Sequence, residues 1–272
     1  SKFDSKFEKF DISKSGFGHS QSEFWIRFTI PPNIPLDKDW ILLIDNYWLD
    51  YIELFYSLEN GEILHRVAGY RFPFHQREIF HHNFAFTLPA INSIDQVYLK
   101  ISDPRYLIEI PLYLKSTKLL IKQLDIKKIL YGTYFGLIAA LAISSLIYFI
   151  TAREAAYFLY TLWLVSVLMM VMNVNGFTYQ YLWPNWTWIE LHSFRILYGF
   201  SNLTMLLFAA AFLNVKKLGT NLKRFLNLLS GFAFLIVLVA LTDFWIAKVE
   251  FIFTLVVAVF LTYIMLTALR KG

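Results

Sequence analysis

Residues 129–150, ILYGTYFGLIAALAISSLIYFI, decide the fold class of this chain because they contain no charged side chain. A membrane-spanning helix needs about 20 consecutive apolar residues, and core helices of soluble domains rarely run that long without a charge. Four further apolar stretches follow, at Ala155–Asn173, Ile189–Phe212, Phe225–Leu241 and Phe251–Leu269. The sequence therefore predicts five membrane-spanning helices within residues 129–272 and a lipid bilayer as partner.

The composition separates this half of the chain from the half before it. The whole chain is 57% hydrophobic and 19% aromatic. Residues 1–128 carry 16 Lys+Arg and 16 Asp+Glu, whereas residues 129–272 carry 9 and 4. A neutral, charge-rich part followed by an apolar, basic part indicates two domains in two solvents. We attribute the net charge of +5 to membrane topology and not to a nucleic-acid partner.

The connections between the apolar stretches predict the orientation. The second connection, from Asn175 to Trp188, holds five Tyr and Trp residues and no Lys or Arg, as expected for a belt at the outer membrane interface. The third contains Lys216, Lys217, Lys223 and Arg224; Arg153 lies in the first, and Arg270 and Lys271 follow the fifth stretch. Because basic loops stay inside, we expect the N-terminal domain outside and residue 272 in the cytoplasm.

Ionisable residues within a span are costly and are candidates for function. Glu190, His192 and Arg195 lie near the outer end of the third stretch. Arg195 could extend to the headgroups, or it could form an ion pair with Glu190 or Asp243 that fixes helix packing. In the first stretch, Gly132 and Gly136 have the four-residue spacing that permits close helix contact and with it a homodimer.

Residues 1–115 predict an all-β domain. Alternation of apolar and polar residues predicts short strands, and Asn60-Gly61 between two of them is typical of a tight hairpin in which both turn residues have positive φ. The expected strands are Phe24–Ile30, Trp40–Ile44, Tyr51–Leu58, Glu62–Val67, Asn83–Leu88, Val97–Ile101 and Tyr106–Leu114. Seven such strands favour a β-sandwich. Residues 116–128 alternate Leu and Ile with lysines, which predicts an amphipathic linker along the membrane surface or, equally, a solvated linker.

The motifs give no indication of an enzyme, a metal site or a cofactor in this chain. Cysteine is absent, and no phosphate-binding loop or nucleophile elbow is present. His75, His81 and His82 lack the spacing of metal ligands. Aromatic and bidentate polar side chains that suit a sugar-like or anionic ligand gather in the middle of the domain. These candidate ligand-binding residues are Trp48, Asp50, Arg71, Phe74, Arg77, His82 and Asn83. For any single one of them the favoured alternative is structural, with Trp48 and Phe74 in the core and the charged side chains solvated.

Several stretches resemble the bacterial seven-transmembrane receptors with diverse intracellular signalling modules. In the β-domain they are Phe24–Phe28 (FWIRF), Ile44–Asp50 (IDNYWLD) and His82–Phe86 (HNFAF). In the membrane half they are Tyr131–Gly136 (YGTYFG) and Gln180–Pro184 (QYLWP). Ser145 stands where the family usually has Asn, so a role of that Asn is in doubt here.

The resemblance implies a fold and a function. The β-domain would be that family's second type of extracellular domain, a jelly-roll-like sandwich similar to carbohydrate-binding modules. It would be periplasmic, in a bacterial inner membrane, and would bind a small molecule or glycan. The family has seven spans and a cytoplasmic signalling domain in cis, so we expect residues 129–272 to be a truncated bundle. Two alternatives stay open: a transporter or channel subunit with an accessory β-domain, and a membrane-anchored carbohydrate-binding protein.

Overall fold

A computed structural model describes residue 7 and residues 22–31, 34–35, 39–103, 109–213, 219–242 and 247–271. The chain divides into two compact units. Unit 1 comprises residues 1–127 and 175–187, and unit 2 comprises residues 128–174 and 188–272. Lys216, Lys217 and Asp243, which entered the predictions above, lie outside the described residues.

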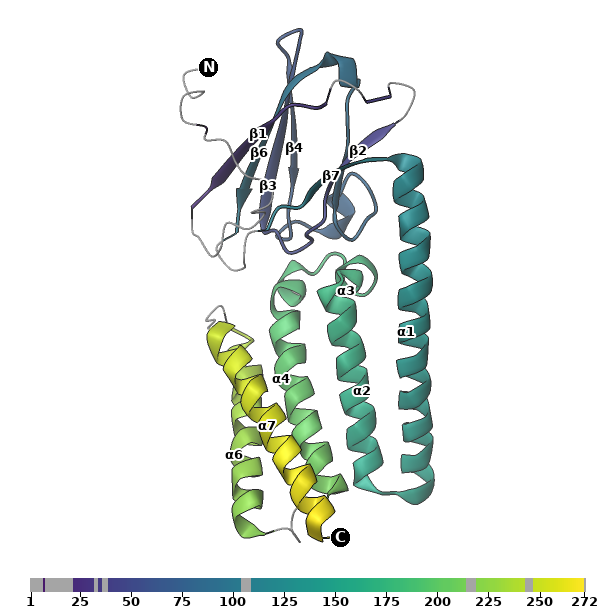
Figure 1. Ribbon diagram of the computed structural model, residues 1–272, viewed down its shortest axis with the longest axis vertical. Coiled ribbons are helices and arrows are strands. Elements are labelled where there is room, and N and C mark those ends of the chain that lie inside the picture. Colours follow the sequence, from purple (N-terminus) through teal and green to yellow (C-terminus); the bar gives the residue numbers. More distant parts are fainter. Residues whose placement is uncertain are drawn as a thin grey trace. The chain divides into compact units, whose positions relative to one another are not determined.

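Unit 1 contains a sandwich of two antiparallel sheets (Figure 1). The four-stranded sheet has the order β1-β6-β3-β4, formed by β1 (Phe24–Phe28), β6 (Ile94–Ser102), β3 (Tyr51–Leu58) and β4 (Ile63–Ala68). The three-stranded sheet has the order β5-β2-β7, formed by β5 (Phe84–Thr87), β2 (Trp40–Ile44) and β7 (Leu112–Ser116). The predicted all-β sandwich is confirmed.

Side-chain alternation along β3 explains the core of the sandwich. Ile52, Leu54 and Tyr56 are buried, because every second residue of a strand points to the same face. They pack with apolar side chains from both sheets, among them Leu42 and Phe86 of the three-stranded sheet. The opposite face of β3 is therefore the outer surface of the sandwich.

The β3–β4 hairpin lies at Asn60-Gly61, as predicted, but with a different turn. The amide of Gly61 donates to the carbonyl of Leu58 at 2.9 Å, and only Gly61 has a positive φ, of 85°. The Asn60 side chain instead accepts a bond from the amide of Glu62 at 2.9 Å. This is the three-residue loop with glycine in a left-handed bulge, so the prediction of positive φ at both turn residues was wrong.

The last strand of the sandwich begins later than predicted. The expectation was Tyr106–Leu114, whereas β7 begins at Leu112, directly after Pro111. Proline has no amide hydrogen to donate to a ladder, which places it at the start of a strand. Residues 106–108 of the predicted strand lie outside the described residues.

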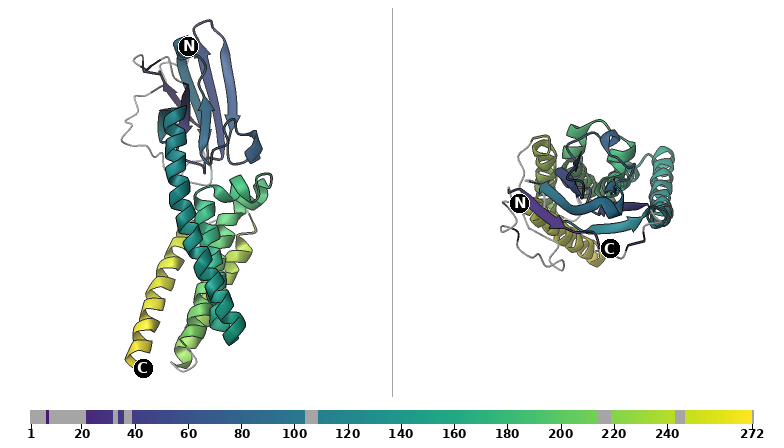
Figure 2. Two further views of the ribbon diagram at one scale, coloured as in Figure 1. Left: turned by 90° about the vertical axis from the view of Figure 1, so that its right-hand side faces the viewer. Right: turned by 90° about the horizontal axis from the view of Figure 1, so that it is seen from above.

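Residues 117–128 belong to a long helix and not to a separate surface segment. Helix α1 runs from Thr117 to Ala152 without interruption (Figure 2). Its first turns pack on the sandwich, because Leu120 is buried against Ile41 and Leu43 of β2, with Leu124 alongside. The apolar residues of the predicted linker thus cover the three-stranded sheet.

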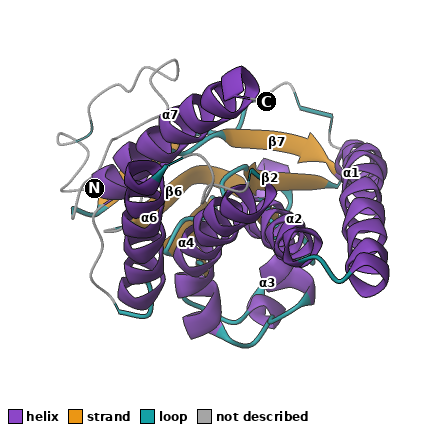
Figure 3. Ribbon diagram, turned by 90° about the horizontal axis from the view of Figure 1, so that it is seen from below, coloured by secondary structure: helices purple, strands orange, loops and turns teal. Residues whose placement is uncertain are grey.

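Unit 2 is a helical bundle. Besides most of α1 it contains α2 (Ala155–Val174), α4 (Thr187–Phe212, from Trp188 onward), α6 (Thr220–Val239) and α7 (Ala247–Lys271). Figure 3 shows α4 between α2 and α6. In the described part of the chain, five helices are long and apolar enough to cross a membrane.

Close helix packing occurs at a glycine that the sequence analysis did not select. A Cβ atom on Gly199 of α4 would lie 2.8 Å from a methyl carbon of Val237 on α6. A larger residue would therefore push these two helices apart. Gly132 and Gly136, in contrast, have no neighbouring atom within 4 Å of such a Cβ. The homodimer suggested by their spacing stays a prediction.

Candidate functional site

The loop between α2 and α4 folds as part of unit 1, together with the sandwich. It contains the short helix α3 (Phe177–Tyr181), in which Tyr179 is fully buried. The Tyr179 hydroxyl donates to the carbonyl of Phe72 at 2.6 Å. Its ring packs against Tyr70 and, edge-on, against Phe74, at centroid distances of 5.9 and 5.8 Å. We call this contact between residues 70–82 and residues 175–187 the loop joint.

Backbone and side-chain bonds complete the loop joint. The amide of Phe74 donates to the carbonyl of Pro184 at 2.8 Å, and the side chains of His75 and Asn185 are 2.8 Å apart at their nearest nitrogen and oxygen. Gly176 begins α3 with a φ of 73°, and a Cβ atom there would lie 3.3 Å from that of His82. The close approach of the loop thus requires glycine at this position.

Arg77 lies at the centre of the loop joint. Its guanidinium carbon lies 4.6 Å from the ring centroid of Phe74, 4.4 Å from that of Phe84 and 5.8 Å from that of Tyr179. The same group donates to the carbonyls of His81 and His82. A planar cation that stacks on rings and binds two carbonyls at once holds several segments together.

Three buried polar residues extend the joint toward β5. The rings of His81 and His82 stack at 4.3 Å, and His81 accepts a bond from the amide of Asn83 at 2.9 Å. Burial lowers the pKa of His81 to about 4 and that of His82 to about 3. The Asn83 side chain donates to Asp45. Both histidines are therefore neutral at pH 7.

Asp50 and Arg71 form an ion pair at the edge of the joint, with the carboxylate buried and the guanidinium half-exposed. Gly69 makes this approach possible, because a Cβ atom there would lie 2.2 Å from the carbonyl oxygen of Asp50. The neighbouring Trp48 is partly buried, with its ring against Tyr47 and Tyr70. These contacts stabilise the end of the four-stranded sheet.

The structure distributes the sequence-predicted ligand cluster over this joint. Phe74 and His82 are buried and contact rings of the loop, and Arg77 lies between them. Asp50 and Arg71 pair with each other, and the buried Asn83 donates to Asp45. The ring faces of Phe74 and His82 are thus occupied by protein and do not form an open platform.

Sequence reasoning missed Tyr179, which we had placed in an interfacial belt. Tyr181 and Trp186, from the same loop, are 57% and 65% exposed, as a belt requires. Tyr179 is 0% exposed and packs in the protein. The only signal was helical spacing: Tyr179 and Tyr181 lie on different faces of a short helix.

A cavity of about 210 Å³ lies beside the joint, between the edges of the two sheets. Its lining includes Arg77 and, from β4 and β5, Arg66, Ala68 and Phe84. Pockets for small molecules usually measure about 300–1,000 Å³, so this cavity is small for a ligand. Of the predicted ligand residues, Arg77 alone contributes to its lining.

Unit 2 contains a buried polar cluster between α2 and α4. The Asn173 side chain donates to Ser193 Oγ at 2.7 Å and to Glu190 Oε2 at 3.3 Å. Glu190 and Asn173 are both 0% exposed. His192 bonds the carbonyl of Trp188 at 2.7 Å, and Arg195 is buried. A buried Arg195 does not fit extension to the headgroups, and Asp243, one of its two predicted partners, lies outside the described residues.

Comparison with known families divides the chain between residues 116 and 127. A family model described as 7TMR-DISM extracellular 2 matches residues 1–116, and one described as 7TM diverse intracellular signalling matches residues 127–272. The chain belongs to the 7TM diverse intracellular signalling family. Neither the search of curated proteins nor that of solved structures gave a match.

In this 7TM diverse intracellular signalling protein, the sandwich is an extracellular domain that precedes a multi-pass membrane region. The loop between α2 and α4 belongs to the same compact unit as that domain. Among the described residues, no group of three His, Asp or Glu side chains could hold a metal ion. The contacts of the joint hold the loop and the sandwich together by ring packing and hydrogen bonds. Ligand binding by the sequence-predicted cluster stays a prediction.

Proposed function

We propose that this chain is the sensing and membrane-spanning part of a signal-transduction receptor of a bacterial inner membrane. A ligand binds the extracellular domain, and the helices carry the change to a signalling domain in cis in the cytoplasm. The family supports the signalling role. A carbohydrate or related small molecule is the expected ligand, from the resemblance of the domain to carbohydrate-binding modules.

The loop joint is the observation that carries this proposal. Residues 175–187 are folded into the extracellular domain, and the chain continues from them into α2 on one side and α4 on the other. A change in the domain at Phe72 or Phe74 thus acts directly on a segment that begins and ends in membrane helices. Together with α1, which starts on the sandwich, this gives three helices tied to the domain.

The same arrangement supports the orientation that we propose. With the loop before α4 on the outer side, one crossing by each of α4, α6 and α7 would bring residue 272 to the cytoplasmic side. The basic residues of the other connections, including Lys223 and Arg224, favour this orientation. A signalling domain attached after residue 272 would then receive the motion of α7.

A two-state bundle is the simplest relay. A ligand changes the equilibrium between two helix arrangements only by its different affinity for them. Shifts of about 1–2 Å between packed helices are typical of such transitions. The polar cluster of Asn173, Glu190 and Ser193 lies at the ends of α2 and α4 next to the loop, where a small displacement would exchange its hydrogen bonds.

The absence of cysteine makes the relay directly measurable. Spin labels at Glu154→Cys and Phe212→Cys mark the ends of α2 and α4 that are far from the loop; both positions are exposed. In the 272-residue chain in lipid nanodiscs, Tyr179→Ala should shift the label-to-label distance by about 1–2 Å or broaden its distribution. Trp186→Ala, at an exposed residue of the same loop, is the matched control and should change nothing. An identical distribution in all three proteins would contradict the relay.

A further inference from the structure

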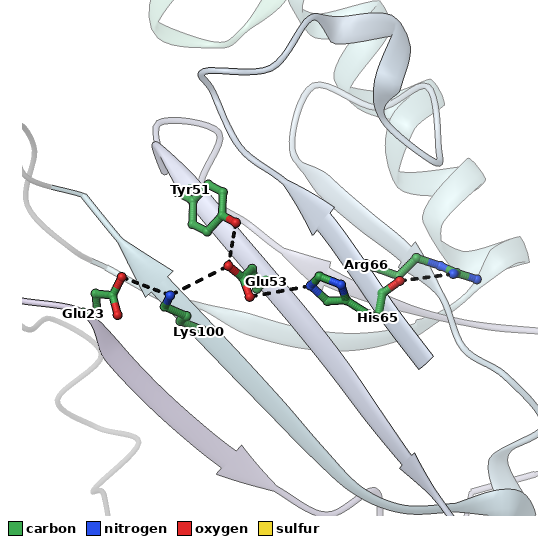
Figure 4. A network of polar contacts seen from close by, with 6 residues as sticks. All are labelled: Glu23, Tyr51, Glu53, His65, Arg66 and Lys100. Atoms are coloured by element: carbon green, nitrogen blue, oxygen red, sulfur yellow. Dashed lines mark hydrogen bonds and ion pairs between the residues drawn. The ribbon is translucent and has the colours of Figure 1, made fainter. Parts of the chain in front are cut away.

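The outer face of the four-stranded sheet carries an ordered group of aromatic and charged side chains (Figure 4). Tyr51, Glu53 and Phe55 alternate with the buried residues of β3 and therefore point away from the core. The strand register places Trp25 opposite Lys100, and Lys100 opposite Glu53. Side chains from β1, β6, β3 and β4 thus meet on one surface.

Rings form a row across this face. Trp25 and Phe55 are nearly parallel, 16° apart, with centroids separated by 5.9 Å. Phe55 and His65 are 6° apart at 4.4 Å. Trp25 at the end of the row is 48% exposed. Its large ring is therefore held in a fixed orientation and remains exposed to solvent. Packing of the core does not require such an exposed ring.

A polar network flanks the exposed indole. The Lys100 ammonium lies 3.0 Å from Glu23 and 3.7 Å from Glu53, and 5.9 Å from the ring centroids of both Trp25 and Tyr51. The Tyr51 hydroxyl donates to Glu53 at 2.5 Å. Hydrogen-bond donors and acceptors thus lie next to one aromatic surface, in an arrangement fixed by their own contacts.

The network carries both signs of charge, with one ammonium between two carboxylates. Lys100 faces two carboxylates, and His65 lies 3.6 Å from Glu53. Glu23 and Glu53 would repel an anion, and Lys100 would repel a cation. A neutral molecule with many hydroxyl groups can donate to the carboxylates and accept from the ammonium at the same time.

The chain itself supplies evidence that this face takes up rings. Phe7 lies against the part of this face formed by Tyr98 and Arg27. The Phe7 ring centroid is 6.3 Å from that of Tyr98 and 4.7 Å from the guanidinium carbon of Arg27. Tyr98 and Arg27 are opposite each other in the ladder, next to the pair of Lys100 and Trp25. A ring-shaped ligand would meet the same kind of surface at Trp25.

We propose that this face binds a neutral saccharide, with a pyranose ring stacked on Trp25 and its hydroxyl groups bonded to Lys100, Glu53 and Glu23. This deepens the proposed function and rests on it, because it names the site and charge class of the sensed ligand. The site shares no residue with the sequence-predicted cluster, in which the rings of Phe74 and His82 pack against the loop.

The site is connected to the loop joint through two contacts. The ring of Tyr51 lies 5.8 Å from that of Phe72, and the carbonyl of Phe72 accepts the bond from Tyr179. The Arg71 guanidinium, paired with Asp50, lies 5.1 Å from the Tyr51 ring centroid. A saccharide that reorients Tyr51 therefore acts on the segment that holds the loop.

The test is calorimetric titration of the 272-residue chain in nanodiscs with neutral hexasaccharides of gluco, xylo and manno configuration and with an acidic oligogalacturonate. We expect at least one neutral saccharide to bind. Trp25→Ala should weaken it about tenfold or more, the effect of losing an aromatic anchor worth about 1.4 kcal/mol. Lys100→Met should weaken it as well. Trp186→Ala, at an exposed tryptophan outside the sheet, should bind as the parent does, and circular dichroism should show every variant folded.

Three results would overturn the site: no neutral saccharide binds, only the acidic one binds, or Trp25→Ala and Lys100→Met both bind within about twofold of the parent. The spin-labelled chain separates this outcome from failure of the relay. Saccharide binding that leaves the Glu154-to-Phe212 label distance unchanged keeps the site and contradicts the receptor proposal. A distance change with Tyr179→Ala in a chain that binds no saccharide keeps the receptor proposal and contradicts the site.

Discussion

The loop joint and the outer face of the four-stranded sheet use the same residue types in opposite ways. In the joint, Phe74 and Tyr179 are almost completely buried, and Arg77 stacks on their rings. On the sheet, Trp25 remains half-exposed beside Lys100. Rings that are covered on all sides contribute stability, whereas a ring held by neighbours and open to solvent can bind. In our proposals the joint serves coupling and the sheet face serves recognition.

The largest expected effect tests whether the joint is structural and the sheet face is not. Phe74→Ala should lower the unfolding free energy of the extracellular domain by about 3–5 kcal/mol, because a buried ring is removed and leaves a cavity. Trp25→Ala, although it removes a larger ring, should cost less than about 1 kcal/mol. Urea unfolding of the nanodisc-embedded chain, followed by the strand signal in circular dichroism, measures both.

Phe80→Ala is the control for this comparison, since Phe80 packs edge-on against Phe74 but is 65% exposed. Phe80→Ala should lower the unfolding free energy by as little as Trp25→Ala does. If Trp25→Ala destabilised the domain as much as Phe74→Ala, the sheet face would be a structural element and the contrast between the two regions would fail.

The next effect is acid destabilisation of the joint through His81 and His82. Their folded pKa values, about 4 and about 3, lie below the ordinary value of 6.5. As the pH falls below 6.5 the unfolded chain takes up protons first, so stability present above that pH is lost progressively toward pH 4 and then 3. At pH 5 the unfolding free energy should be lower than at pH 7 by about 2 kcal/mol for each histidine.

The charged groups around these histidines reinforce the effect, since Arg77 and Lys127 oppose a further positive charge and only Asp45 favours one. Urea unfolding at pH 7 and pH 5 measures the loss. His82→Gln should remove about half of the pH dependence. Equal slopes in His82→Gln and the parent would show that the buried pair is not responsible.

The smallest effect isolates one hydrogen bond of the joint. Tyr179→Phe keeps the ring but leaves the carbonyl of Phe72 without the hydroxyl, at a cost of about 1 kcal/mol. Hydrogen exchange of peptides covering residues 70–78 and 176–187 should then be faster. Tyr181→Phe, in the same short helix but exposed, should have no effect. Unchanged exchange in Tyr179→Phe would mean that packing alone holds the loop.

The sandwich and the apolar helices could be predicted from local patterns, since alternation and long uncharged stretches are properties of neighbouring residues. The site could not be predicted in the same way. Trp48, Asp50, Arg71, Phe74 and Arg77 were selected for their chemistry, which is the same in a covered joint and in an open binding face. In the structure the loop covers Phe74 and Arg77. Trp48 packs instead on Tyr47 and Tyr70, and Arg71 remains half-exposed.

By itself the sequence determined the all-β sandwich and the apolar helices, because alternation along a strand and a long uncharged stretch are properties that each segment shows alone. The tertiary structure decided the rest. Tyr179 meets Phe72 across 107 residues, and Trp25 meets Phe55 across an intervening strand. Such contacts arise from how the segments pack, so no repeat within a single segment encodes them. That packing separates the ring that joins the domain to the helices from the ring we propose to bind the ligand.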